Sequence, residues 1–400
     1  MTARRRWVSL AIVAALVLLV AAVAGTSARG GSAAKKPIVI GWALDLTKAM
    51  APFDAPGLVS AQLEIKKINA AGGVDGRKLQ LKYVNTQLDP KKTKQAAASL
   101  IAGAADVLFV TCDVEYAAPA VQEGINHGKL VVAPCIGTDQ MGPRRFGGKG
   151  KLAFSTGNVA QDEGAAMAEY AIKRGWTTAQ VVSDNLLVYF RDVCKAFQVR
   201  FEEKGGKIVH TDGFVAGDKT IENVISRVNG QSSKVVAFCD AFGDLPTFVG
   251  GMRSLNNHTP ILNSWGGDGN YWYPKDPKVT DYYYVTYASA FGDDPDPRVR
   301  ALAAQMKKLG KPPGSGAFVQ GPTAVEAVVA AIKRAGGSTD GAALAAQFEK
   351  FKGLPTLSGK ISFSPQFHSV FGRTYRVIKV TDNVPKVVGE IKASSPAKIR

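Results

Sequence analysis

The stretch INAAGGVDGRKLQL, residues 68–81, holds three glycines within five positions, between two apolar patterns of different period. Before it, apolar residues recur at helical spacing over residues 58–71. After it, KLQLKYV alternates apolar and polar residues, as a half-buried strand does. Gly72 supplies the left-handed residue that ends a helix, and Asp75 with Gly76 makes a tight turn. The stretch therefore predicts a helix that turns back at once beside its neighbouring strand, which is a tight βαβ unit.

The alternation of strand-like and helix-like segments continues in two successive series. The first ends near residue 135, and LAFSTGN at residues 152–158 opens the second. Short, fully apolar strands that alternate with helices are typical of a parallel sheet covered on both faces. The sequence therefore predicts an α/β protein with two Rossmann-like lobes, each built on a parallel central sheet. Helices expected over residues 299–351 have no strand series of their own, so they return to one lobe, and several strands cross between the lobes as a hinge.

The N-terminus has the pattern of an export signal. Arg4, Arg5 and Arg6 precede an apolar run over residues 7–24 that ends in small residues. A charged head, an apolar middle and a small-residue exit predict a cleaved signal peptide over residues 1–28. An uncleaved membrane anchor is the alternative, because the run approaches the ~18 residues that begin to indicate a span. In either form, we expect the protein in the periplasm or at the outer face of the cytoplasmic membrane.

The chain is basic, with 50 Lys and Arg residues, 33 Asp and Glu residues and a formal net charge of +17. Such a surplus favours anionic surroundings or ligands. The basic residues are scattered, without a basic helix or zinc-finger spacing, so no nucleic-acid partner is predicted. A solvated basic surface at the cell envelope is the simpler explanation of the surplus.

The four cysteines are Cys112, Cys135, Cys194 and Cys239. An even count in an exported protein indicates disulfides. Two cysteines fall in each half of the chain, and pairing within each half is the simplest of the three connectivities. Four buried free thiols are the alternative.

Motifs of catalysis and cofactor binding are missing from the sequence. No glycine-rich dinucleotide loop follows a strand, and neither a P-loop nor a nucleophile elbow is present. The four histidines are scattered, without a metal-ligand pair at helical spacing. Carboxylates follow strands at Asp45, Asp113 and Asp240, but the sequence shows no pairing of them for acid–base work. The sequence therefore predicts no enzyme, no cofactor and no metal site.

Polar or small residues recur just after the predicted strands. In open α/β sheets, ligands bind beyond the carboxyl ends of the strands, where helix N-termini offer free N–H groups suited to a carboxylate. Each of these residues, taken alone, could instead be explained by a role in a turn or as a helix cap. Spread over both lobes, the set favours a ligand site between them. The segments are residues 44–47, 111–116, 134–139, 184–189, 239–244 and 263–272.

Three motifs carry a family resemblance: the opening stretch, LDPKKTKQAAASLI from Leu88, and SGAFVQGPTAVEAVVAAI from Ser315. With them, the chain resembles the periplasmic leucine/isoleucine/valine-binding family of solute-binding proteins, which serve ABC importers. The resemblance implies a type I periplasmic-binding-protein fold, in which two lobes joined by three crossings close on a small molecule. It places the first lobe at residues 37–154 and 288–362, the second at residues 155–287 and 363–400, and the crossings near residues 154–156, 286–289 and 362–363.

The resemblance also implies where a ligand is held. In amino-acid-binding relatives, the loops after the third and fourth strands hold the carboxylate and the ammonium, and here they are residues 112–116 and 135–138. The ammonium-binding glutamate of the relatives falls near Trp265, and the nearest acid is Asp268. A buried ammonium without a carboxylate costs several kcal/mol. Either Asp268, Asp113 or Asp240 therefore takes this role, or the ligand has no ammonium.

An aromatic-lined cleft in a basic protein suits an aromatic or bulky apolar carboxylate, although each aromatic alone is more often core packing. The aromatic candidates are Trp42, Phe53, Tyr116, Tyr189, Phe242 and Trp265. Thr138 and the N–H groups of residues 112–114 are expected to hold an anionic group, while Tyr189, Phe242 and Trp265 cover the apolar part. The full set of expected contacts is Asp45, Phe53, Cys112, Asp113, Val114, Cys135, Gly137, Thr138, Tyr189, Phe242, Trp265 and Asp268.

The resemblance implies a monomeric, non-catalytic protein that binds a small amino acid or carboxylate by hinge closure and delivers it to an ABC permease. Two alternatives stay open at this point. In the first, the same lobes form the ligand-binding part of a receptor that signals through a membrane partner. In the second, they form an enzyme of the cell envelope.

Overall fold

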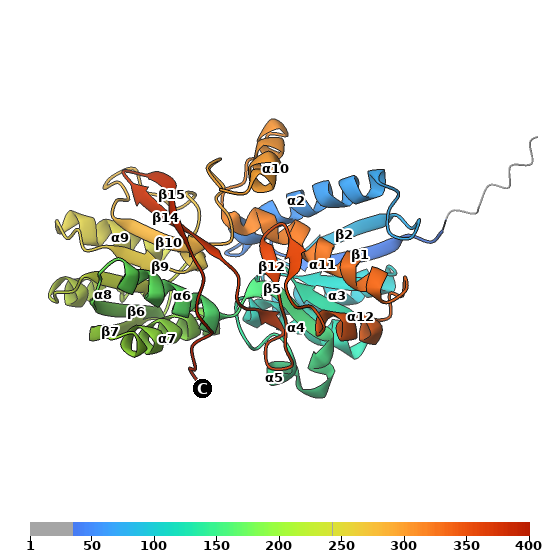
Figure 1. Cartoon of the computed structure of the whole chain (residues 1–400), viewed down its shortest axis with the longest axis horizontal. Coiled ribbons are helices and arrows are strands. Elements are labelled where there is room, and N and C mark those ends of the chain that lie inside the picture. Colours follow the sequence, from blue (N-terminus) through green and yellow to red (C-terminus); the bar gives the residue numbers. More distant parts are fainter. Residues whose placement is uncertain (1–34, 242) are drawn as a thin grey trace, which may run out of the picture. The chain divides into compact units, whose positions relative to one another are not determined.

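The computed structural model describes residues 35–241 and 243–400, and the predicted signal peptide over residues 1–28 lies outside them. Pro37–Arg400 forms a unit of its own that holds two α/β lobes (Figure 1). Within the described residues, no helix is both long enough and apolar enough to cross a membrane.

The first lobe is built on a six-stranded sheet in the order β13-β5-β4-β3-β1-β2, in which every pairing is parallel. One face packs against helices α2, α11 and α12, and the other packs against α3 and α4. The strands are β1 (Ile38–Leu44), β2 (Leu79–Asn85), β3 (Val107–Val110), β4 (Leu130–Ala133), β5 (Ala153–Asn158) and β13 (Ser369–Val370). The helices are α2 (Ala51–Ala70), α3 (Pro90–Ala102), α4 (Val114–Asn126), α5 (Pro143–Phe146), α10 (Pro297–Lys308), α11 (Gln320–Arg334) and α12 (Gly341–Phe348). Short 3₁₀ helices η1 (Gly147–Leu152) and η3 (Gly316–Val319) and a hairpin of β11 (Leu354–Thr356) and β12 (Gly359–Ile361) complete it.

The second lobe is built on a seven-stranded sheet in the order β15-β14-β10-β9-β8-β6-β7. Five strands are parallel, whereas β14 and β15 join antiparallel at one edge. Helices α6 and α7 cover one face, and α8 and α9 cover the other. The strands are β6 (Thr178–Asp184), β7 (Lys207–Phe214), β8 (Val235–Cys239), β9 (Ile261–Asn263), β10 (Tyr282–Thr286), β14 (Tyr375–Thr381) and β15 (Val384–Ile391). The helices are α6 (Ala160–Lys173), α7 (Val188–Glu203), α8 (Ile221–Asn229) and α9 (Asp244–Ser254), with the 3₁₀ helix η2 (Trp265–Gly267).

The glycine-rich stretch folds as its sequence predicts. Helix α2 ends at Ala70, and β2 begins at Leu79 parallel to β1. Gly72 has a φ of 102°, which is left-handed, and a Cβ on Gly73 would lie 2.1 Å from the carbonyl oxygen of Arg77. Only glycine fits such positions without strain. The predicted tight βαβ unit is confirmed.

The chain crosses between the sheets three times, after β5, after β10 and between β13 and β14. The third crossing lies later than expected. A crossing near residues 362–363 would follow β12 directly, but β12 pairs with β11, and β13 still pairs with β5 in the first sheet. With only two residues, β13 has no alternation that the sequence could reveal. Strand β5 also pairs with β4 and β13 of the first sheet as far as Asn158. The first lobe therefore extends beyond residue 154, where its boundary was expected.

The three crossings meet at Arg373, whose side chain is buried. Its Nη2 donates to the carbonyl oxygen of Thr156 at 2.7 Å, and its guanidinium lies 5.2 Å from the ring centre of Tyr287. Arg373 lies in the third crossing, Tyr287 follows β10 in the second, and Thr156 is on β5 just before the first. One side chain therefore links all three places where the chain passes between the sheets.

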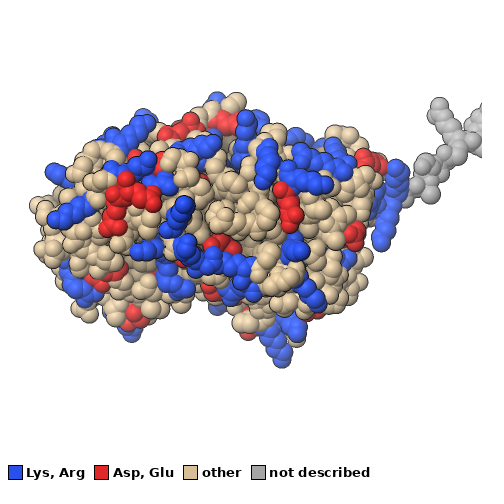
Figure 2. All heavy atoms as spheres, turned by 60° about the horizontal axis from the view of Figure 1, so that its bottom comes forward, with Lys and Arg blue, Asp and Glu red and all other residues tan. Residues whose placement is uncertain are grey.

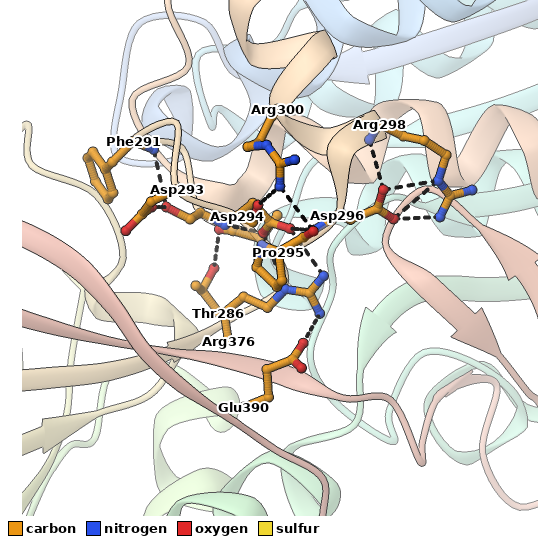
Figure 3. Close-up of polar contacts among 12 residues, drawn as sticks. Thr286, Phe291, Asp293, Asp294, Pro295, Asp296, Arg298, Arg300, Arg376 and Glu390 are labelled. Atoms are coloured by element: carbon orange, nitrogen blue, oxygen red, sulfur yellow. Dashed lines mark hydrogen bonds and ion pairs between the residues drawn. The ribbon is translucent and has the colours of Figure 1, made fainter.

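An ionic network attaches the segment after the second crossing to the edge of the second sheet (Figure 3). Arg376 on β14 contacts Asp294 at 3.2 Å and Glu390 on β15 at 3.1 Å. Asp294 also accepts a hydrogen bond from the N–H of Ser289 at 2.7 Å. The chain that leaves β10 is therefore anchored to β14 and β15 before it reaches α10.

Candidate functional site

A small cavity lies between the two lobes, at the carboxyl ends of strands from both sheets. Its volume is about 30 Å³, which is enough for one or two water molecules. The two lobes are therefore in close contact around it. The first lobe contributes Met50, Phe53, Cys112, Asp113 and Gly137, and the second contributes Leu187, Tyr189, Phe190, Ala241, Trp265 and Gly266.

A larger, open groove of about 510 Å³ runs beside the N-terminal half of α2. Most of its wall comes from α2 and from the segment after α10, and only Tyr271 comes from the second lobe. Closure of the lobes does not form this groove. The strand ends of both sheets meet at the smaller cavity, which is where open α/β sheets hold ligands.

Asp113 is the one charged side chain among the described residues that line the cavity. It is the N-cap of α4 and accepts hydrogen bonds from the N–H groups of Glu115 at 2.9 Å and Tyr116 at 3.2 Å. Burial, together with the neighbouring Glu115 carboxylate, raises the pKa of Asp113 well above its usual range. Losing water costs the ionised form more than the neutral form.

Two further carboxyl groups, those of Asp54 and Asp45, lie behind the first-lobe wall. Asp54 on α2 accepts hydrogen bonds from the N–H of Asp45 at 2.8 Å, the hydroxyl of Thr111 at 2.6 Å and the N–H of Cys112 at 3.1 Å. Burial raises the pKa of Asp54 to about 7. Asp45 in turn accepts from the N–H groups that follow it, including that of Met50 at 3.0 Å. The N–H of Cys112, expected to bind an anionic ligand, is therefore already bonded to Asp54.

Glu163 on α6 fixes the second-lobe wall. Its carboxyl accepts a hydrogen bond from the hydroxyl of Tyr189 at 3.0 Å and from the N–H of Trp265 at 2.5 Å. Burial raises the pKa of Glu163 to about 8, although both hydrogen bonds favour its ionised form. Glu163 was not among the site residues predicted from the sequence. The signal was the run Gln161, Asp162, Glu163 in the first turn of a helix that follows a strand end.

Aromatic rings close the cavity from both sides. Phe53 of the first lobe packs on Trp265 of the second, with ring centres 4.9 Å apart. The ring of Tyr189 lies against Gly137, where a Cβ would come within 2.6 Å of it. The absence of a side chain at Gly137 therefore lets the second lobe approach this closely.

The four cysteines form two disulfides, one within each half of the chain, which is the simplest of the three connectivities that the sequence left open, and one of them belongs to the site. Cys112–Cys135 joins the loops after β3 and β4, and Cys194–Cys239 joins α7 to β8. Asp54 lies near the first pair in an arrangement that resembles a metal site, but the bonded sulfurs offer no thiolate to a metal.

The cavity gathers six of the residues predicted from the sequence and leaves others behind its walls. Those that line it are Phe53, Cys112, Asp113, Gly137, Tyr189 and Trp265, and the structure adds Met50, Leu187, Phe190, Ala241 and Gly266. Asp45, Val114, Cys135, Thr138 and Asp268 do not line it, and Phe242 lies outside the described residues.

The predicted residues that do not line the cavity have other contacts. Thr138 accepts a hydrogen bond from the hydroxyl of Ser369 at its carbonyl oxygen, at 2.7 Å. Asp268 accepts from the hydroxyl of Thr286 at 2.7 Å and from the N–H of Gly316 at 2.6 Å. Trp42 is buried in the core of the first lobe, where its indole N–H donates to the carbonyl oxygen of Val110.

Charge on the outside of the molecule differs from charge in the cavity. On the face shown in Figure 2, lysine and arginine side chains are spread over both lobes and interspersed with acidic and uncharged ones. The basic surplus is therefore at the surface here, while the cavity carries acidic groups.

Comparisons with known proteins agree with this fold. The family model described as periplasmic binding protein matches residues 37–385. The Leu/Ile/Val-binding protein homolog 3 of Brucella melitensis biotype 1 is 25% identical over 339 residues, covering 83% of this chain and 89% of its own length.

Solved structures share the fold. The branched-chain amino acid transporter substrate binding protein LivJ from Streptococcus pneumoniae, in complex with isoleucine, superimposes with a TM-score of 0.74 at 19% identity, covering 90% of this chain and 100% of its own. A solute binding protein of an ABC transporter from R. palustris, in complex with benzoate, gives a TM-score of 0.71 at 18% identity, covering 90% and 97%.

Proposed function

Because the chain belongs to the periplasmic binding protein family, we propose that it is the extracytoplasmic solute-binding component of an ABC importer. It captures one small molecule between its lobes and presents the closed form to a membrane permease. It acts as an exported monomer and does not alter the ligand. The observation that carries the proposal is the cavity whose walls come from the strand ends of both lobes.

Hinge closure is the proposed mechanism. A ligand that contacts both lobes binds the closed form more tightly than the open form, so it shifts the population toward closure. The contacts available for this are Phe53 and Asp113 from the first lobe and Tyr189 and Trp265 from the second. Glu163 keeps Tyr189 and Trp265 in place, and the crossings at Arg373 are where the lobes turn.

The ligand we propose is small and has an apolar body, because most of the cavity wall is aromatic or aliphatic. The similar solved structures hold isoleucine and benzoate, both small molecules with an apolar part. An amino acid or an apolar carboxylate is the starting set of candidates for this protein.

Mass spectrometry of small molecules released from gently purified full-length protein tests the proposal. The released compound, added back, is expected to change the intrinsic fluorescence, because Trp265 lies in the cavity wall. Trp265→Phe should abolish the change. Trp176→Phe should keep it, because Trp176 packs on Tyr170 and Tyr283 within the second lobe.

Small-angle X-ray scattering adds a second readout, in which the ligand should lower the radius of gyration. A released compound that changes neither signal contradicts the proposal. So does steady conversion of that compound into a product.

A further inference from the structure

The cavity is acidic although the protein is basic. Asp113 is its one charged lining group, and no lysine, arginine or histidine stands among the lining residues that the structure describes. Residue 242, which follows Ala241 in the sequence, is a phenylalanine and not a basic residue. Behind the walls lie the carboxyl groups of Asp54 and Glu163. A ligand in the cavity therefore faces acids without a countercharge on the wall.

The backbone N–H groups that suit an anion are largely taken in the first lobe. Asp54 and Asp45 accept those in the loop after β1, and Asp54 also accepts that of Cys112 after β3. Asp113 caps the first turn of α4 with its own carboxyl group. An anionic ligand group placed here would meet carboxyl groups in the positions that an anion would fill.

One feature of the second lobe favours an anion. Helix α7 begins at Val188 beside the cavity, and no described side chain caps its first turn. Its partial charge is roughly +0.5, and it weakens beyond the first turn. A cation bound beside Asp113 favours the ionised form of its carboxyl group. That carboxylate carries a full charge on the cavity wall, so we expect it to outweigh the helix end.

Aromatic rings complete the site. Phe53, Tyr189, Phe190 and Trp265 line the cavity around Asp113. Ring faces attract cations, more strongly when water is excluded. A cation also supplies the opposite charge that makes a buried carboxylate tolerable.

We propose that the cavity selects an organic cation, an ammonium group on a small apolar body, with the positive charge at Asp113 and the body against the aromatic walls. The ligand needs no carboxylate. This inference rests on the proposed function, because it assumes that the cavity is the ligand site.

Calorimetric titration of the full-length protein with matched compounds tests the ligand class. Isoamylamine, leucine and isocaproate share one branched body, and phenethylamine, phenylalanine and hydrocinnamate share an aromatic one. In each series, the amine should bind at least about tenfold tighter than the acid, and the amino acid should gain nothing from its carboxylate. An acid that binds as tightly as its amine overturns the inference, and the end of α7 would then be the dominant feature.

Asp113→Asn tests the role of the charge. Asparagine caps helix N-termini as well as aspartate, so α4 keeps its cap while the charge is lost. The dissociation constant of the amine should rise by about tenfold or more. Asp89→Asn is the matched control, because Asp89 caps α3 in the same way, accepting from the N–H of Lys92 at 2.7 Å, and does not line the cavity. Equal affinities in Asp113→Asn and the unmodified protein would overturn the inference.

The compound released from the purified protein separates the two proposals. If that compound is neutral or anionic and closes the lobes, the cation inference fails while the proposed function stands. If no compound closes the lobes, both fail. A released amine that closes them supports both.

Discussion

Glu163 accepts hydrogen bonds from the hydroxyl of Tyr189 and the N–H of Trp265, so one buried carboxyl group positions two residues of the second-lobe wall. Asp113, Tyr189 and Trp265 could be predicted from the sequence, because each follows a strand end. Glu163 was missed although it also follows a strand end, in the first turn of α6, because nearly the whole of this helix is buried. A helix without an exposed face gives no periodic signal of which side meets a cleft.

Stability should depend on pH through Glu163. Burial raises its pKa from 4.5 to about 8, so between these values the folded state holds a proton that the unfolded state has released. The resulting stability is fully present below pH 4.5 and is lost as pH rises through about 8, with a slope of about 1.4 kcal/mol per pH unit. Urea unfolding from pH 5 to pH 8 should therefore show a flatter decline in Glu163→Gln than in the unmodified protein.

A matched control for this experiment is Glu222→Gln, because Glu222 lies on the exposed face of α8. It should reproduce the pH dependence of the unmodified protein. Parallel curves for Glu163→Gln and the unmodified protein would contradict the assigned pKa.

At the scale of elements, the strand–helix alternation was readable wherever a strand is buried on both faces, as in β1, β3 and β8. Strand β15 was not predicted. Its sequence VPKVVGEI alternates only between exposed and half-buried positions at the sheet edge. Edge strands that carry Pro and Gly give a weak strand pattern. The antiparallel edge of the second sheet was missed for this reason.

The two disulfides should have similar effects on stability and different effects on binding. Cys112–Cys135 spans a sequence separation of 23 and Cys194–Cys239 one of 45, for which chain entropy predicts about 3–4 kcal/mol each. Replacing either pair with alanine should lower the urea midpoint by comparable amounts. Only the Cys112–Cys135 double variant should weaken binding of the released ligand, because this pair joins two loops of the cavity.

Calorimetry of both double variants checks this prediction under conditions where each stays folded. The Cys194–Cys239 variant is the control, since that bond connects α7 and β8 within the second lobe. Equal losses of affinity in the two variants would mean that the first disulfide has no special role at the cavity.

For the molecule as a whole, the family expected from three sequence motifs is confirmed by the match over residues 37–385. The contacts that join the lobes could not be read from the sequence, because they bring together positions far apart in the chain. Arg400 is one example. Its Nη2 contacts Asp139 of the first lobe at 3.4 Å and also contacts Asp192 on α7 of the second lobe.

Removal of this link should favour the open form. Arg400→Ala loses an ion pair to each lobe, so we expect a larger radius of gyration without ligand and a dissociation constant that rises by a few-fold. Scattering and calorimetry measure the two effects. Arg298→Ala is the control, because Arg298 forms an exposed ion pair with the nearby Asp296 (Figure 3), and such pairs contribute little. Identical scattering from Arg400→Ala and the unmodified protein would show that the link does not hold the lobes together.

The contact between Gly137 and the ring of Tyr189 limits how far the lobes can close, because a Cβ at position 137 would lie 2.6 Å from a carbon of that ring. A single methyl group at position 137 would act as a spacer that keeps the halves slightly ajar. Such a spacer leaves the other residues of the cavity unchanged, but it prevents the ligand from contacting both lobes at once. The ligand would still bind to one lobe, but it would dissociate faster because the closed form is no longer reached.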